Sequence, residues 1–530
     1  MEAGTSPFAG NRHVQALVIG LIGLGVIWEL AAWIVAGSDK TLLSFGTAIV
    51  ACAIILQILS DWRSGAMVFL IWLVFEDLVR KYLGNSMTVY FTKDFIVGVA
   101  YISFLLAKRR QKVETFKVPF LIPLTIFFCF ALIQVFNPWT PSVLYGFLGI
   151  KLYFYYVPLI FLGYAMLEKP ADLDRLLQIS LITGIIVAGL GIVQSVVGID
   201  FLNPVDLAPE LVELTRLTRR TPISQLDVPV TTSVFVSVGR FSQYLILVWI
   251  LAMGAQGYLL LSRRRGAKWG FLAIGVVSVA VVITGNRTPV VFVIISALMM
   301  TAAFLWGAPW RWGQGHRLVK ALRRTIFIGA VALILMVEVY PNVMGAHWAF
   351  VSETLAFQGE GSELVSRSWG YPIMNLGLAF QHERWIQGYG TGLNSLGAQY
   401  VARFLDQPVP NIGVENGFGM LIVEMGIVAP FLWLYWVGAM MVAAWRVVRQ
   451  LRQTVYFPIG FAILWNAFVL TILLMHFGIQ SYQNFVNNAY MWLLMGVLFR
   501  LPKLAQMPQP VLIPRRLRLV PHWGFALGGR

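Results

Sequence analysis

The sequence predicts an all-α membrane protein, a polytopic transmembrane helical bundle of about 14 helices, in a range of about 12–14. Of its 530 residues, 58 % are hydrophobic and 12 % are charged, whereas soluble domains have about 45–50 % apolar and about 25 % charged residues. Apolar runs of roughly 18–22 residues recur along the chain, and each matches one helical crossing of a ~30 Å hydrocarbon core. The short alternating segments of a membrane barrel are not seen. A soluble multidomain protein is therefore excluded.

Fourteen apolar runs are expected to form helices. The first is longer than the apolar region of a signal peptide and has no clear cleavage site, so it counts as a crossing. The ninth and tenth nearly meet at Gly285–Asn286–Arg287, so a count of twelve or thirteen stays open. The expected ranges are 14–36, 41–60, 66–82, 90–107, 118–136, 147–167, 176–197, 241–261, 268–285, 287–306, 324–341, 415–445, 456–478 and 485–500.

Basic groups fall on one side of the membrane if these helices alternate. They include Lys108–Arg110, Arg263–Arg265, Arg446–Arg452 and the tail around Arg515. The positive-inside rule makes that side cytoplasmic, with both termini on it. The net charge of +16 is then mainly a signal of topology, and no nucleic-acid partner is expected. Cys52 and Cys129 lie in apolar runs and indicate no disulfide.

Two external loops are long and aromatic, and we expect both to be ordered. They separate the helical segments, and the second is expected to hold helices near 364–380 and 392–404. The organisation is helices 1–7 in 1–197, a first loop at 198–240, helices 8–11 in 241–341, a second loop at 342–414, helices 12–14 in 415–500, and a basic tail at 501–530.

External arginines are the first candidate site residues. Arg287 opens the tenth helix after a Gly–Asn break, Arg240 stands where the first loop meets a helix, and Arg367 and Arg384 lie in the second loop. An arginine at a membrane boundary is costly unless it is solvated or paired, and its planar fork suits a phosphate. Each could instead reach out to the lipid headgroups. Arg403 is a weaker candidate, and Arg216, Arg219 and Arg220 fit a solvated face.

Two further motifs lie on the same side. The glycine run at 388–392 includes Gly390 and Gly392 and fits either a turn approached by a headgroup or sugar or a plain loop turn. A nucleotide fingerprint is rejected because no βαβ context surrounds it. Glu415 and Asn416 open the twelfth helix. Glu415 could act as a general base, or it could offset the helix dipole while Asn416 caps the helix.

Signals for metal or nucleophile chemistry are weak, and we predict a metal-independent site without a cofactor. The pair Asp172 and Asp174 lies in a cytoplasmic loop, where acidic residues favour the start of the next helix. Glu76 and Asp77 stand beside Arg80 and Lys81 within an apolar run. We expect that group to form internal ion pairs.

These motifs, in this order, resemble the O-antigen ligase and Wzy polysaccharide polymerase superfamily. The matching features are Arg240 at a helix start, "TGNRTP" at 284–289, "SRSWGYPIMNLGLAFQHERWIQGYGTG" at 366–392 and "VENGFGMLIVEMGIVAPFLWL" at 414–434. The resemblance covers about residues 235–500, while residues 1–200 match only as generic membrane helices.

The resemblance implies a glycosyltransferase at the periplasmic face of a bacterial inner membrane. The donor would be an undecaprenyl-diphosphate-linked oligosaccharide, and the leaving lipid diphosphate would supply the activation. Arg287, together with Arg240 and Arg367, would bind the diphosphate. Glu415 would serve catalysis. The donor or glycan would be contacted by Arg384, Gly390, Gly392 and Asn416. A chain-length regulator, a flippase and membrane lipid are the partners that the family implies.

Three functions stay open. Family ligases have a histidine where this chain has Glu415, which favours a polymerase that joins repeat units into exopolysaccharide or O-antigen. A ligase would move finished glycan to lipid A core or to protein. A lipid-linked oligosaccharide transporter, or flippase, should instead show charged or broken helices at the bilayer midplane and related halves.

Overall fold

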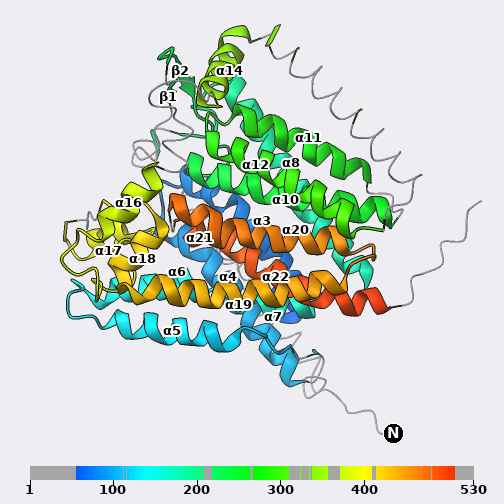
Figure 1. Ribbon diagram of the computed structural model, residues 1–530, viewed down its shortest axis with the longest axis horizontal. Helices are drawn as coiled ribbons and strands as arrows, with labels where there is room; N and C mark the ends of the chain where they lie inside the picture. The colour runs from blue at the N-terminus through cyan, green and yellow to red at the C-terminus, as the bar shows by residue number, and fades with distance from the viewer. Residues whose placement is uncertain are drawn as a thin grey trace, which may run out of the picture. The chain divides into compact units, whose positions relative to one another are not determined.

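The computed structural model describes residues 55–110, 113–114, 116–204, 206–207, 218–221, 223–262, 267–309, 323, 334, 337–338, 340–355, 370–408, 413–478 and 480–507. The chain divides into two compact units, residues 1–70 with 91–113, and residues 71–90 with 114–530. We call these unit 1 and unit 2 and describe each by itself (Figure 1).

The described residues form 17 α-helices, so the expectation of a helical bundle is confirmed. In the first half of the chain these are α3 (Trp62–Tyr82), α4 (Met87–Arg109), α5 (Leu121–Val135), α6 (Val143–Phe154), α7 (Leu159–Ala165), α8 (Pro170–Val197) and α10 (Val238–Leu261). In the second half they are α11 (Ala267–Ile283), α12 (Arg287–Gly307), α14 (Pro341–Leu355), α16 (Tyr371–Ala379), α17 (Ala398–Phe404), α18 (Gly417–Met425), α19 (Val428–Gln450), α20 (Phe457–Phe468), α21 (Gln480–Gln483) and α22 (Phe485–Gln506).

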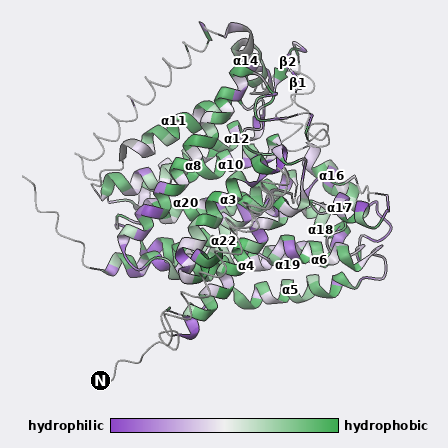
Figure 2. Cartoon of the chain, turned by 180° about the vertical axis from the view of Figure 1, so that it is seen from behind, coloured by the Kyte–Doolittle hydropathy of each residue, from purple (hydrophilic) through white to green (hydrophobic). Residues whose placement is uncertain are grey.

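Seven helical segments among the described residues are long and apolar enough to cross a membrane. They are Met87–Arg109, Val143–Ala165, Pro170–Val197, Val238–Leu261, Arg287–Gly307, Val428–Gln450 and Phe457–Phe477. The shorter helices α5 and α11 are also coloured mainly hydrophobic in Figure 2. These segments indicate a protein embedded in a membrane.

Unit 1 contains the first part of α3 and most of α4. The Trp62 ring meets the Phe104 ring edge to face, with the centroids 5.1 Å apart. The hydroxyl of Ser103 donates to the carbonyl oxygen of Leu59 over 3.3 Å.

In unit 2, α7 and α22 pack against each other through two glycines. A Cβ on Gly163 would overlap the carbonyl oxygen of Leu493, and a Cβ on Gly496 would overlap that of Ile160. Small residues at such a contact let two helix backbones approach closely, which is how helices associate in lipid. The pair α7–α22 therefore depends on the absence of a side chain at both positions.

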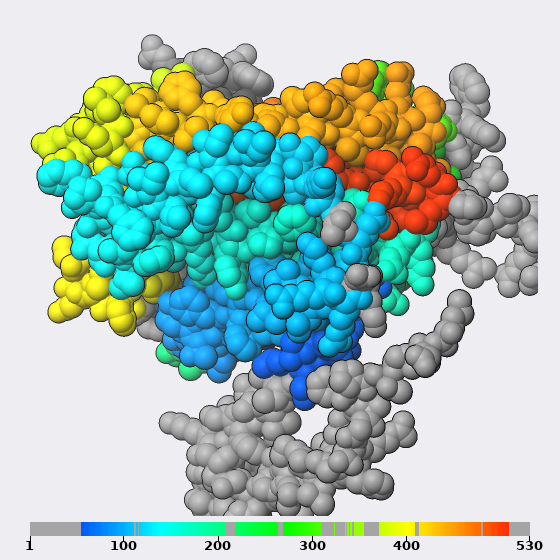
Figure 3. Space-filling view, turned by 90° about the horizontal axis from the view of Figure 1, so that it is seen from below, coloured from blue at the N-terminus to red at the C-terminus, as the bar shows by residue number. Residues whose placement is uncertain are grey.

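Aromatic side chains fill the centre of unit 2. The ring of Trp433 lies 5.0 Å from that of Trp436 and 4.8 Å from that of Tyr482, and Trp436 stacks on Trp492 at 5.8 Å. All four are buried. The cluster joins α19, α21 and α22, and α5 runs alongside α19 on the face drawn in Figure 3.

Several expected helices differ from those observed. The run 415–445 is not one helix: it breaks at Gly426 into α18 and α19, because Gly426 has φ +85° and a Cβ there would overlap the carbonyl oxygen of Ile386. The run 147–167 contains a turn before Pro158, which divides it into α6 and α7. α8 starts at Pro170, six positions before the expected boundary, and Asp172 accepts hydrogen bonds from the backbone N–H groups of Glu168 and Lys169.

The two long loops also differ in detail. The first loop also contains a short hairpin, in which β1 (Thr218–Arg220) pairs antiparallel with β2 (Asp227–Pro229). In the second loop the described helices are α14, α16 and α17, and α14 was not expected there. α17 begins only after Gly397, which is in the left-handed conformation. The expected helix 14–36, most of 41–60 and nearly all of 324–341 lie outside the described residues.

We expect Gly496→Ala to destabilise the protein by about 1–3 kcal/mol, because the added methyl group overpacks the backbone contact with α7. Gly438→Ala in α19 is the matched control, since a Cβ at Gly438 has no neighbour within 4 Å. Thermal unfolding of both variants in the same detergent measures the difference. Equal midpoints for the two variants would contradict the close α7–α22 contact.

Candidate functional site

A helix break organises the end of unit 2 that carries the two long loops, which we call the loop end. After Phe468 the α-helical pattern of α20 changes to a π-helix, η2 (Val469–Leu473), and then to a 3₁₀ helix, η3 (Leu474–Phe477). Gly478 stops the helix with φ +144°, and α21 follows. Mid-helix π and 3₁₀ turns are common at functional sites. The candidate residues are found around this break.

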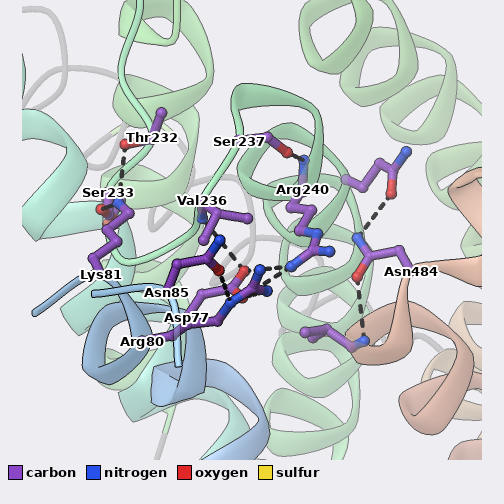
Figure 4. Close-up of polar contacts among 12 residues, drawn as sticks. Asp77, Arg80, Lys81, Asn85, Thr232, Ser233, Val236, Ser237, Arg240 and Asn484 are labelled. Carbon is purple, nitrogen blue, oxygen red and sulfur yellow. Dashed lines mark hydrogen bonds and ion pairs between the residues drawn. The ribbon is translucent and has the colours of Figure 1, made fainter. Parts of the chain in front are cut away.

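Arg240 is held by a buried carboxylate. Its Nη1 donates to Oδ1 and Oδ2 of Asp77 over 2.9 and 2.8 Å, and the backbone N–H of Val236 donates to the same carboxylate over 3.3 Å. Arg80 lies on the other side of Asp77, with 4.0 Å between Nη1 and Oδ1 (Figure 4). The expected internal ion pairing of Asp77 is confirmed. Asp77 thus joins α3 to the first turn of α10.

Further cations lie beside this ion pair. Arg80 lies over the ring of Tyr90 at 5.2 Å and over that of Tyr400 at 5.5 Å, and it donates to the Tyr400 hydroxyl. The Nζ of Lys151 is 4.8 Å from the Tyr90 ring centre. Lys81 donates to Thr232 and to the carbonyl of Ser233 on the first loop (Figure 4). We call Arg80, Lys81, Lys151 and Arg240 the cation cluster.

Arg287 occupies the first position of α12, as expected from the sequence. The side chain of Asn286 caps this helix by accepting from the N–H of Thr288 and donates to Ser242 on α10 over 2.9 Å. Ser242 is two residues beyond Arg240. Gly285 has φ +63°, and a Cβ there would lie 2.9 Å from the carbonyl oxygen of Pro229 in β2. The turn before Arg287 is therefore fixed between α10 and the hairpin.

Amide side chains connect α10 to the helix break. Gln243 donates to the hydroxyl of Ser481 over 2.9 Å and accepts from Asn484 over 2.8 Å. Asn484 caps α22 through the N–H of Val486. Hydrogen bonds therefore connect the start of α10 at Arg240, the cap residue Asn286 and the segment 478–484 in one network at the loop end.

Glu415 and Asn416 are connected to the same network through the helix break. Asn416 is buried; its Oδ1 accepts from the N–H groups of Phe418 and Gly419, and its Nδ2 donates to the carbonyls of Pro372 and His476. Both amide hydrogens and the carbonyl are thus used, so Asn416 caps and anchors α18. This agrees with its capping role rather than with contact to a ligand.

Glu415 itself is exposed. Its carboxylate accepts a short hydrogen bond from the hydroxyl of Tyr371, and its backbone N–H donates to Asn375 over 3.2 Å. A Cβ on Gly478 would lie 3.0 Å from the carbonyl oxygen of Glu415. The carboxylate is therefore oriented by α16 and stands beside the helix break, open to a ligand.

The glycine run lies elsewhere and is buried. Gly390 and Gly392 have φ +113° and +87°, and side chains there would overlap Thr140 and the carbonyl of Tyr145 in the α5–α6 region. Arg384 lies over the ring of Trp139 at 3.2 Å. The two glycines serve close packing of the second loop on α5 and α6 and offer no backbone to a ligand.

The sequence interpretation missed Glu424. This residue is fully buried in α18, outside the seven candidate membrane segments. Its carboxylate accepts from the Tyr153 hydroxyl over 3.1 Å, from the N–H of Asn394 over 3.1 Å and from the Ser395 hydroxyl over 3.2 Å. Burial raises the pKa of Glu424 to about 7, although these hydrogen bonds act against the rise. A single acid inside the apolar stretch 417–425 was the signal available.

The remaining candidates are dispersed. Arg367 lies outside the described residues. Arg219 donates weakly to Asn286 over 3.5 Å, and Arg220 forms an exposed ion pair with Asp227. Within the described ranges no three His, Cys, Asp or Glu side chains gather as a metal-binding group.

No protein-family model matches the chain, and no curated protein sequence matches it significantly.

Protonation of Glu424 gives a prediction for stability. Because the folded-state pKa of about 7 lies above the ordinary value of 4.5, the folded protein binds a proton that the unfolded chain releases between these values. Stability should therefore fall as pH rises from 4.5 to about 7, by on the order of 3 kcal/mol. Glu424→Gln keeps the hydrogen-bond acceptor and should remove this dependence.

The measurement is thermal unfolding of both proteins in detergent at pH 5 to 8, which covers most of this change and the range above its end near pH 7. The midpoint of the wild type should decline relative to that of Glu424→Gln as pH rises. Parallel curves would mean that Glu424 is already ionised in the folded protein throughout this range.

Proposed function

We propose that this protein is a polymerase that joins undecaprenyl-diphosphate-linked oligosaccharide repeat units into exopolysaccharide or O-antigen. It would act at the periplasmic face of a bacterial inner membrane, with both termini in the cytoplasm. The protein would be a glycosyltransferase that needs no metal ion, because the lipid diphosphate is already an activated leaving group.

The cation cluster is the observation that supports this proposal most directly. Within unit 2 it places four cations near two buried acids, Glu76 and Asp77. Arginine binds phosphate oxygens through two parallel hydrogen bonds, and a lysine ammonium adds a point charge. A diphosphate is therefore a ligand that a group of arginines and lysines of this kind would fit.

The position of the cluster agrees with a lipid-linked donor. Arg240 lies in the first turn of the candidate membrane segment Val238–Leu261, so a ligand's lipid tail could remain in the bilayer while its diphosphate reached the cations. Arg287 stands at the positive end of the α12 dipole, which also favours an anion. We assign Arg240 to donor positioning through its ion pair with Asp77, and Arg287 to direct contact with the diphosphate.

Glu415 supports the transfer step. The acceptor hydroxyl oxygen forms a bond to the anomeric carbon of the donor, and the bond from that carbon to the diphosphate oxygen breaks. The electron pair leaves on the diphosphate, where Arg287 and the cluster stabilise the charge. Glu415, oriented by Tyr371, accepts the hydrogen bond of the attacking hydroxyl and raises its nucleophilicity.

We expect Arg287→Ala to abolish chain growth while the protein still inserts into the membrane, because it removes diphosphate contact from a half-buried side chain at a helix start. Arg220→Ala is the matched control, since Arg220 is an exposed arginine of the neighbouring hairpin. Both variants are introduced into cells lacking the native protein, and their lipid-linked glycans are extracted and sized.

Single repeat units on undecaprenyl diphosphate should accumulate with Arg287→Ala, and long polymer should persist with Arg220→Ala. Normal polymer from Arg287→Ala would contradict the assignment. Long lipid-linked polymer that never reaches its acceptor would indicate a ligase, and units retained on the cytoplasmic leaflet would indicate a flippase.

A second variant separates donor binding from transfer. Glu415→Gln should retain the lipid-linked donor but lower the transfer rate by about 10²-fold or more. The assay follows elongation of the donor by purified protein in nanodiscs, with binding measured as donor retained on the immobilised protein. Loss of binding in Glu415→Gln would move Glu415 from the transfer step to the donor site.

A further inference from the structure

His476 is brought to Glu415 by the helix break. It lies in η3, and Asn416, the residue after Glu415, donates from Nδ2 to its carbonyl oxygen over 3.2 Å. Its ring meets the Phe418 ring edge to face with centroids 5.5 Å apart. Asn416 therefore holds the backbone of His476 close to that of Glu415, although the two residues lie far apart in the sequence.

Both side chains are open to a ligand. His476 and Glu415 are exposed, whereas the backbone that carries them is fixed by the buried amide of Asn416. A histidine needed only for packing would be covered by its neighbours. Phe418 instead holds the imidazole from one side and leaves the remainder of the ring available.

The chemistry distinguishes the two groups. The Tyr371 hydroxyl donates to the Glu415 carboxylate, which occupies one of its acceptor positions and fixes its orientation. An imidazole has an ordinary pKa near 6.5, close to the pH at which a general base is most efficient. Glu415 is therefore better suited to orienting a hydroxyl, and His476 to accepting its proton.

We propose that His476 is a catalytic residue of the transfer reaction and takes the proton of the acceptor hydroxyl that Glu415 orients. This inference rests on the proposed function. As the oxygen bonds to the anomeric carbon and lipid diphosphate departs with the electron pair, the proton moves to an imidazole nitrogen. The exposed imidazolium then releases the proton to water, and the neutral base is restored.

Other titratable side chains lie near His476. The elements packed against η3 are η2, α18 and α21, and α12 also reaches it through the Phe292 ring against Phe477; the charged residue of α12 on this side is Arg287. The titratable side chains they bring are Glu415 at the start of α18, Glu424 buried within it and Tyr482 buried in α21. Tyr371 faces Glu415 from α16.

The test is elongation by the full-length protein in nanodiscs, with lipid-linked repeat units extracted from cells that lack it. The wild-type rate should rise with pH and level off below about pH 7.5, as an imidazole loses its proton. His476→Gln should be about 10²-fold slower at pH 7.5 and should lose this rise. His382→Gln is the control, because His382 is another histidine of the loop end and packs on Tyr389.

Chemical rescue separates catalysis from a structural role. Imidazole added to His476→Ala should restore part of the rate, which a merely structural loss would not allow. Donor binding and the unfolding midpoint should match those of the wild type.

The outcomes distinguish this inference from the function on which it rests. If the wild type elongates, Arg287→Ala is inactive and His476→Gln keeps the full rate and pH profile, the proposed function stands and the role of His476 is overturned. An inactive His476→Ala without imidazole rescue also overturns it. If the wild type itself does not elongate the donor, the proposed function fails first.

Discussion

The carboxylate of Asp77 is the group on which the loop end depends. It is buried and compensates Arg240 from α10 and Arg80 from its own helix, and it also accepts the N–H of Val236. Removing one partner of a buried ion pair costs about 3–5 kcal/mol, because the other charge is left without compensation. The first turn of α10, the end of the first loop and the orientation of Arg240 therefore share one constraint, and the cation cluster is assembled around it.

The second organising feature is the interrupted end of α20. An unbroken α-helix would carry His476 and Gly478 past the start of α18. The π and 3₁₀ turns instead bring the backbone carbonyl of His476 within hydrogen-bond distance of Asn416. The amide of Asn416 makes four hydrogen bonds in all. One buried side chain thus fixes α16, α18 and the break together. Such a fully satisfied polar group in the interior specifies a single arrangement.

Much of this architecture was predictable from local patterns. The start of α12 followed from the Gly–Asn break before an apolar run, and the ion pairing of Asp77 followed from charges that are costly inside a membrane. The break at Gly426 was not predictable, because the apolar pattern continues through it and the reason lies in the backbone of Ile386. Likewise the glycine run revealed unusual backbone conformation, but only the structure shows that Gly392 packs against Tyr145 and Gly149. The roles of Asn416 and Glu424 depend on contacts with residues far away in sequence.

The π-helical turn of η2 has a consequence for how this chain can change. An α-helix turns by about 100° per residue, and a π turn contains one residue more than an α turn. Loss of one residue between Val469 and Leu473 would let the helix regain its regular form, because one normal turn would remain and later side chains would keep their angular position. Loss of one residue from the regular part of α20 would instead rotate every later side chain by about 100°, and His476 would leave the ring of Phe418. The π turn is therefore a place where this helix can lose a residue without moving the side chains of the loop end.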